Sequence, residues 1–213
     1  AFNNITGIYT PEEGSIKWRG EEIRGLTPYQ IVDRGIVRTF QTIRLFSQMS
    51  VAENIMSGRH IKSSQKWWHG IIPTPWSRRD EHENWKKVEE QLEFFKLSPY
   101  AASPTGSLPY GIQRRVEMAR AMAVEPNLLI LDEPAAGLND KETLELLQTI
   151  YQIRDKGVTV LLIEHDMDMV MQLTDYLTVI NFGKKIAEGT PKEIQKNPAV
   201  IEAYLGSEDD DDE

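Results

Sequence analysis

The segment Leu128–Pro134 reads Leu-Leu-Ile-Leu-Asp-Glu-Pro, and it constrains the fold more than any other part of the chain. Four consecutive aliphatic residues followed at once by two acids predict a buried strand whose carboxyl end carries Asp132 and Glu133. Open parallel sheets bind their ligands at that edge. Adjacent carboxylates on a buried strand are costly unless a cation lies against them. Nucleotide hydrolysis requires one acid that holds magnesium and one that orients or deprotonates water. The alternative is that both acids are simply solvated at the strand end.

Composition describes an ordinary globular chain. Its 213 residues suffice for one sizeable domain or for a core with a small subdomain, and 40% hydrophobic and 27% charged residues are typical of soluble proteins. No apolar run approaches the roughly 18 residues that a membrane span needs. The absence of cysteine and of a secretory signal agrees with a reducing cytoplasm.

The net charge of −9 comes mostly from the C-terminus, because residues 208–213 are all acidic. The remainder of the chain is nearly balanced, so the sequence does not predict binding to nucleic acid. We expect the acidic run to be a solvated tail, and an interaction tail is the alternative.

The first half of the sequence predicts short elements. Residues 14–23 alternate around Gly20 and predict short strands joined by a tight turn. Thr27 followed by Pro28 predicts a helix start, and Gly35 ends that helix. Ser50 and Glu53 form a capping box that begins another helix.

A tryptophan-rich stretch precedes a longer predicted helix. Residues 61–80 are rich in turn formers and are expected to be irregular. The next helix is predicted from about Asp80 to Phe95, with a buried face formed by residues at helical spacing. That face comprises Trp85, Val88, Leu92 and Phe95. The tryptophans between Trp67 and Trp85 fit either a membrane or partner surface or the core of a small subdomain.

From residue 114 the pattern becomes helix, strand, helix, strand. A helix over 114–122 leads to the strand 128–131, and the capping box of Asn139 and Glu142 opens a helix that ends at Gly157. Residues 158–163 form a second aliphatic strand, which is typical of a sheet covered on both faces. Helices starting at Pro191 and Pro198 follow. Two βα units with buried strands predict an α/β fold with parallel strands.

Three further sites accompany the acidic pair. His165 follows the second aliphatic strand, so it leaves the same sheet edge as Asp132 and Glu133, and we interpret it as a phosphate contact rather than a surface histidine. The segment Leu108–Gln113 places Gly111 in a turn at a helix N-terminus, where backbone N–H groups suit an anion. Gln41 ends another strand-like stretch and could reach a metal or a water.

These motifs occur in the order found in ABC-type ATPases: Gln41 of the Q-loop, the signature motif around Gly111, the Walker B strand with Asp132-Glu133-Pro134, and the switch residue His165. Finer matches resemble the LivG-type subunit of branched-chain amino-acid importers, over roughly residues 1–206. They are Arg38–Phe46, Tyr110–Arg115, Ala135–Asn139, Gly189–Pro191 and Val200–Gly206.

The resemblance implies a RecA-like P-loop NTPase core with an inserted helical subdomain. The expected division is a core of 1–46 and 116–190, a helical subdomain of 47–115 with the signature motif, a helical extension of 191–206 and a tail of 207–213. The resemblance also implies partners. These are a second ATPase subunit, either identical or LivF-like, in a head-to-tail dimer, and permease subunits in the membrane. A periplasmic solute receptor is an indirect partner. The chain would then lie at the cytoplasmic face of the membrane as a peripheral subunit, with residues near Phe46 flanking the groove that receives a permease helix.

The resemblance also assigns roles for ATP and Mg²⁺. Asp132 would hold magnesium through water, Glu133 would polarise the attacking water, and Gln41 would sense both magnesium and water. His165 would contact the γ-phosphate. Gly111 would donate its N–H to a nucleotide on the opposite subunit. The remaining expected nucleotide contacts are Leu108, Pro109, Tyr110, Gln113 and Asn139.

Two features depart from the family pattern. The 213 residues contain no glycine-rich loop ending in Gly-Lys-Thr or Gly-Lys-Ser, which would bind the β- and γ-phosphates, and residues 1–7 resemble the helix that follows such a loop. We therefore expect a chain cut from a longer ATPase that alone neither binds nor hydrolyses ATP appreciably. Pro109 stands where the family usually has serine. The alternatives are an ABC ATPase for another process, such as urea uptake or lipid export, and a non-catalytic interaction fragment.

Overall fold

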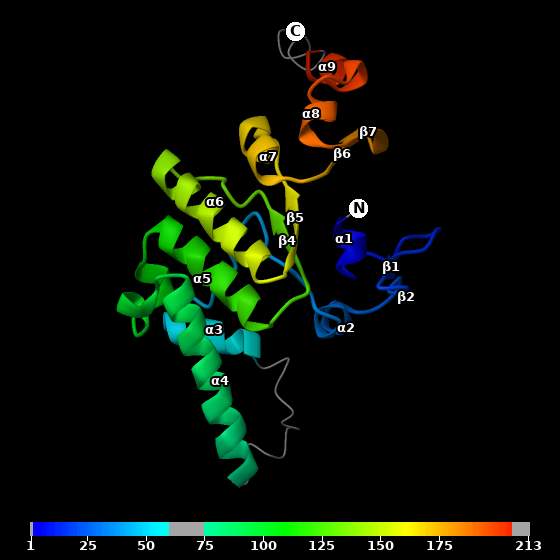
Figure 1. Ribbon diagram of the computed structural model, residues 1–213. Helices are drawn as coiled ribbons and strands as arrows, with labels where there is room; N and C mark the ends of the chain where they lie inside the picture. The colour runs from blue at the N-terminus through cyan, green and yellow to red at the C-terminus, as the bar shows by residue number, and fades with distance from the viewer. Residues whose placement is uncertain (1, 60–74, 206–213) are drawn as a thin grey trace. The chain divides into compact units, whose positions relative to one another are not determined.

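The computed structural model describes residues 2–59 and 75–205 of the chain (Figure 1). These form two compact units, Ala1–Ile163 and Glu164–Glu213, and each unit is described by itself. The first contains α1 (Phe2–Ile5), β1 (Lys17–Trp18), β2 (Glu21–Glu22), α2 (Pro28–Asp33), β3 (Ile36–Arg38), α3 (Val51–Arg59), α4 (Pro75–Phe94), α5 (Tyr110–Ala123), β4 (Leu128–Asp132), α6 (Asp140–Asp155) and β5 (Thr159–Ile163), with single 3₁₀ turns at Ser98–Tyr100 and Thr105–Ser107.

A parallel sheet in the order β3-β4-β5 organises the first unit. Strand β4 lies in the centre, and its residues Leu128 to Leu131 are buried. The register pairs Arg38 with Ile130 and Asp132 with Ile163, so the carboxyl ends of all three strands lie at one edge of the sheet. The prediction of a parallel α/β sheet is confirmed.

The second aliphatic strand differs from its prediction. We expected residues 158–163 to be covered on both faces, but Val160 to Ile163 of β5 are only partly buried and Thr159 is exposed. The reason is position: among the described residues β5 pairs with β4 alone and lies at the end of the sheet. A continuous aliphatic run reports the character of a strand and not its place in the sheet order.

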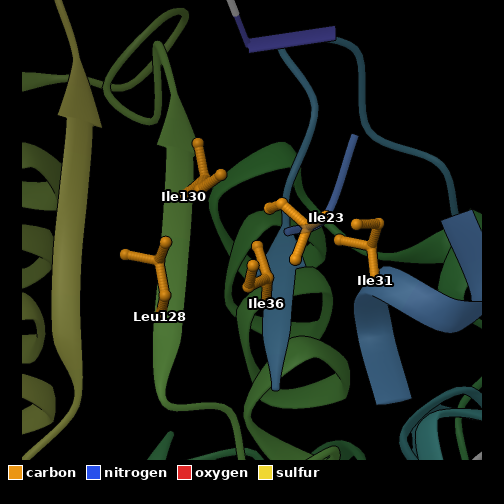
Figure 2. Packing of buried hydrophobic residues seen from close by; sticks show 5 residues of the cluster. All are labelled: Ile23, Ile31, Ile36, Leu128 and Ile130. Carbon is orange, nitrogen blue, oxygen red and sulfur yellow. The ribbon is translucent and has the colours of Figure 1, made fainter. Parts of the chain in front are cut away.

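The core beside the sheet consists mostly of isoleucine. Ile36 on β3 and both Leu128 and Ile130 on β4 face Ile23, which follows β2, and Ile31 of α2 (Figure 2). All five side chains are buried, and partly buried residues of α1 and β1 pack against them. Branched aliphatic residues suit such a layer because their stiff side chains pack well on a pleated surface.

Local capping explains where several helices begin, as predicted. In α2 the Thr27 side chain accepts from the N–H of Gln30, and the Gln30 side chain accepts from the N–H of Thr27. Ser50 and Glu53 exchange the same pair of bonds before α3. Gly35 follows α2 with φ +80°, a left-handed conformation that glycine adopts without strain.

Helices α3, α4 and α5 pack against one another (Figure 1). Helix α4 begins at Pro75, earlier than the predicted Asp80, and residues 61–74 of the predicted irregular stretch lie outside the described part of the chain. The predicted buried face is confirmed at Val88, Leu92 and Phe95 but is wrong at Trp85, which is 39% exposed. Its neighbour Asn84 is buried instead.

The exchange of Trp85 for Asn84 has a polar cause. The buried Arg59 side chain of α3 donates from Nε to Asn84 Oδ1 at 3.1 Å and from Nη1 to the Ala123 carbonyl at 2.8 Å. A buried guanidinium needs hydrogen-bond acceptors. Asn84 faces inward because its side-chain oxygen is one of these acceptors, and the neighbouring Trp85 side chain is therefore exposed.

The second unit comprises α7 (Met167–Leu173), the antiparallel strands β6 (Leu177–Asn181) and β7 (Lys184–Gly189), α8 (Pro191–Ile194) and α9 (Pro198–Leu205). The predicted starts of both C-terminal helices at proline are confirmed. Ala187, Ile194 and Val200 form its small core. The predicted acidic tail lies outside the described residues. None of the described helices is both long and apolar enough to span a bilayer.

Candidate functional site

The acidic pair marks a sharp change of backbone direction. Asp132 is the last residue of β4, and Glu133 adopts φ +44°, a left-handed conformation uncommon for a residue with a side chain. The Glu133 N–H still donates to the Ile163 carbonyl at 2.9 Å, so the turn begins while the chain is fastened to β5. Backbone strain of this kind concentrates at functional sites, where it aims a side chain.

Arg38 supplies the cation that the acidic pair requires. Its Nη2 lies 2.6 Å from Asp132 Oδ2, and its Nη1 donates to Asn3 Oδ1 at 2.7 Å. Both partners of the ion pair are largely buried. The sequence pattern predicts magnesium beside Asp132 and does not single out Arg38. A basic residue ending the neighbouring aliphatic strand was the available indication, because parallel strands bring their ends together.

Gln41 reaches the second acid of the pair. Its Nε2 donates to Glu133 Oε2 at 2.5 Å, across 92 positions of sequence. Thr39, two residues earlier, still belongs to the sheet ladder, since its N–H donates to the Ile130 carbonyl at 3.0 Å. Between them the Phe40 ring lies against the guanidinium groups of Arg38 and Arg44 at 5.2 and 4.6 Å. The structure therefore brings Gln41 and Glu133 together at the carboxyl edge of the sheet.

A buried ion pair on α5 adjoins Gln41. Arg114 donates to the carbonyls of Phe40 and Gln41, each at 2.9 Å, and to Glu117 Oε2 at 2.9 Å. Burial raises the pKa of the Glu117 carboxyl, and the neighbouring Arg114 guanidinium lowers it by less. Neither Arg114 nor Glu117 is predicted in the site from the sequence.

The signature motif differs in one respect from its prediction. We expected Gly111 in a turn before a helix at 114–122, but α5 already begins at Tyr110 and Gly111 lies in its first turn. Pro109 is the N-cap residue, a position where its missing N–H costs no intrahelical bond. Gln113 Nε2 donates to the Leu108 carbonyl at 2.8 Å and closes this end of the helix.

The segment after the acidic pair packs on the signature motif. A Cβ atom at Gly111 would collide with Glu142 Oε1, and one at Gly137 would lie 3.2 Å from the Tyr110 ring. Asn139 is the N-cap of α6, and it forms the predicted capping box with Glu142. A cavity of about 310 Å³ between α5 and α6 opens beside these contacts.

His165 belongs to the second unit, two residues beyond the end of β5. Its side chain is exposed, and Asp166 next to it caps α7 by accepting from the Met169 N–H at 3.1 Å. The role of His165 as a phosphate contact stays a prediction.

The sheet edge offers oxygen ligands of the kind that Mg²⁺ takes in proteins. Among the described residues there is no cluster of three or more His, Cys, Asp or Glu side chains that could hold a metal alone. Asp132 and Gln41 instead offer a carboxylate and an amide oxygen at one sheet edge. Mg²⁺ binds in this way, through one or two protein oxygens completed by substrate phosphates and water.

Two family profiles match the chain. One, described as ABC transporter, matches residues 1–136. The other, described as branched-chain amino acid ATP-binding cassette transporter, matches residues 184–210. Together they cover the strand end with the acidic pair and the C-terminal segment.

Curated relatives and solved structures agree with these profiles. The chain is 47% identical over 206 residues to the high-affinity branched-chain amino acid transport ATP-binding protein BraF of Pseudomonas aeruginosa, and 45% identical over 206 residues to LivG of Escherichia coli. Each match covers 96% of this chain and 81% of the relative. A crystallised ATP-binding cassette of an ABC transporter in its ADP conformation superimposes with a TM-score of 0.80 at 31% identity, covering 96% of this chain and 82% of that one. A nucleotide-free cassette gives a TM-score of 0.78 at 32% identity, covering 95% and 81%.

Proposed function

Because the chain belongs to the ABC transporter family, we propose that it is the ATP-hydrolysing subunit of an importer for branched-chain amino acids. The relatives BraF and LivG carry that transport in their names, and the profile matching residues 184–210 is specific to the same class. The contact between Gln41 and Glu133 supports the hydrolytic part of the proposal, because an amide and a carboxylate side by side can orient a water.

The residues of this site have separable roles in the proposal. Glu133 accepts a proton from the attacking water, and Gln41 holds that carboxylate in position. Asp132, through a water, and the Gln41 oxygen would hold Mg²⁺, which would neutralise charge on the phosphates. Arg38 pairs with Asp132 and holds its carboxylate at the strand end. The first N–H groups of α5, beginning at Tyr110, suit the phosphates of a nucleotide held by a second subunit.

Assembly follows the same reasoning. Two ATPase subunits would enclose two ATP molecules head to tail, with this chain paired either with its copy or with a LivF-like partner. The pair would bind permease subunits at the cytoplasmic face of the membrane, and a periplasmic receptor would deliver the solute. The division into a core of 1–46 and 116–190, a helical subdomain of 47–115 and a helical extension of 191–206 belongs to this proposal.

Transport by the assembled complex tests the solute. The complete transporter is reconstituted in proteoliposomes with ATP inside, and we expect uptake of labelled leucine, isoleucine and valine that stops when ATP is replaced by ADP. Labelled urea is the control. Uptake of urea without uptake of leucine would contradict the proposed solute. It would leave the proposed ATPase function intact, because other subunits select the solute.

Nucleotide binding by the isolated 213 residues forms a second prediction. They contain no glycine-rich loop with its lysine, which donates to the β- and γ-phosphates in P-loop enzymes. We therefore expect titration with Mg-ATP by calorimetry to show no micromolar affinity. The matched control is the same chain preceded by the phosphate-binding segment of LivG, which is expected to bind. Micromolar binding by the chain alone would show that the remaining residues suffice.

A further inference from the structure

Arg114 is among the most deeply buried charged residues of the described chain, at 1% exposure. Its two terminal nitrogens divide their hydrogen bonds between two segments. They reach the Phe40 and Gln41 carbonyls on one side, both at 2.9 Å, and the Tyr110 hydroxyl on the other, at 3.1 Å. One side chain thus joins the backbone beside the glutamine to the first turn of α5.

The guanidinium is itself held in place. Glu117, one helical turn further along α5 and 2% exposed, accepts from Nη1 at 2.9 Å. A buried ion pair of this kind is weak evidence for stability, because removing both charges from water offsets much of their attraction. Its planar geometry contributes orientation instead, since a guanidinium held by fixed partners donates its hydrogen bonds in only one plane.

The carbonyls that Arg114 binds lie beyond the sheet. The ladder between β3 and β4 ends with the Thr39 N–H, so the sheet does not determine where the next two residues go. The Gln41 side chain then extends to Glu133 Oε2 at 2.5 Å. The position of this amide therefore depends on the backbone that Arg114 binds.

We infer that Arg114 is a positioning residue for ATP hydrolysis, fastening the backbone of Phe40 and Gln41 to helix α5 so that the Gln41 amide meets the Glu133 carboxylate. Glu117 orients the guanidinium for this task. The inference rests on the proposed ATPase function and deepens it. Arg114 also links the Gln41 backbone to Tyr110, so that a movement of the first turn of α5, where the signature motif lies, would move Gln41 as well.

A double-mutant cycle on the complete transporter tests this role. Arg114→Lys keeps the charge but loses the planar fork, and we expect kcat for ATP to fall about tenfold or more, because small misplacements of catalytic groups cost that much. KM for ATP is expected to change little. In a Gln41→Ala background, Arg114→Lys is expected to lower kcat by less than about twofold further, because residues acting through one another are not additive.

Controls separate positioning from folding. Arg154→Lys on the exposed end of α6 makes the same exchange and is expected to leave kcat unchanged. Glu117→Gln is measured in parallel as a second perturbation of the guanidinium, and urea midpoints are recorded for all variants. Equal losses from Arg114→Lys with and without Gln41 would overturn the inference, as would unfolding of both the Arg114 and Glu117 variants. An inactive parent transporter would instead refute the proposed function.

Discussion

Replacing Glu133 by glutamine in the assembled transporter is expected to lower kcat for ATP hydrolysis about 10²- to 10⁴-fold, the range for loss of a general base. Glutamine has the shape of glutamate and can still accept the bond from Gln41, so the geometry of the sheet edge is retained. It cannot take a proton from water. ATP affinity should therefore persist, and steady-state hydrolysis together with equilibrium binding of labelled ATP measures the two effects separately.

The matched control for this prediction is Glu89→Gln, the same exchange on the exposed side of α4. It is expected to leave hydrolysis at the parental rate. Hydrolysis by the Glu133 variant within a few fold of the parent would show that another group activates the water. Loss of ATP binding along with hydrolysis would show a structural role for Glu133.

Truncation of Ile130 to alanine is expected to have the largest effect on folding, a loss of about 2–5 kcal/mol in the free energy of unfolding. The side chain is 0% exposed and lies in the isoleucine layer between β4 and the residues around α2 (Figure 2). Since domains of this kind are stable by only about 5–15 kcal/mol, the change would shift the urea midpoint strongly.

Two variants calibrate that measurement. Ile130→Val removes one methylene and is expected to cost only about 0.5–1.5 kcal/mol. Leu144→Ala truncates an aliphatic side chain that is 59% exposed on α6 and should leave the midpoint almost unchanged. Equal effects of the Ile130 and Leu144 truncations would contradict the assignment of the core.

Features that depend on neighbours in sequence were predictable. The capping boxes at Ser50 and Asn139 and the helix start at Thr27-Pro28 each follow from residues close together in sequence, and all three are present. The strand at 128–131 follows from an uninterrupted aliphatic run. In these cases the interaction that sets the structure lies within one helical turn or one strand.

Features that depend on distant partners were not predictable. Trp85 is exposed because its neighbour Asn84 faces inward to accept a hydrogen bond from Arg59, 25 positions away. The partner of Asp132 is Arg38, 94 positions earlier. Helical spacing and strand patterns rank residues by polarity, and they contain no information about which buried cation will need an acceptor.

Part of the candidate site followed from the sequence. Asp132 and Glu133 were named from the aliphatic run that precedes them and Gln41 from the strand-like stretch that it ends, and the structure joins Gln41 to Glu133. Nothing in the local sequence distinguishes Arg114 from a solvated helical arginine, and only the fold shows that it is buried. The role of His165 depends on the relation between two separate units of the chain.

Strand β5 has a consequence for handling the protein. In the described part of the chain its ladder bonds run to β4, and its five residues Thr159–Ile163 include neither a charge nor a proline. A strand edge without a charge or a proline can pair with another extended chain. We therefore expect concentrated solutions of the isolated chain to aggregate by strand addition at β5. A lysine introduced into β5 should reduce this aggregation, because a charged side chain disfavours edge-to-edge pairing.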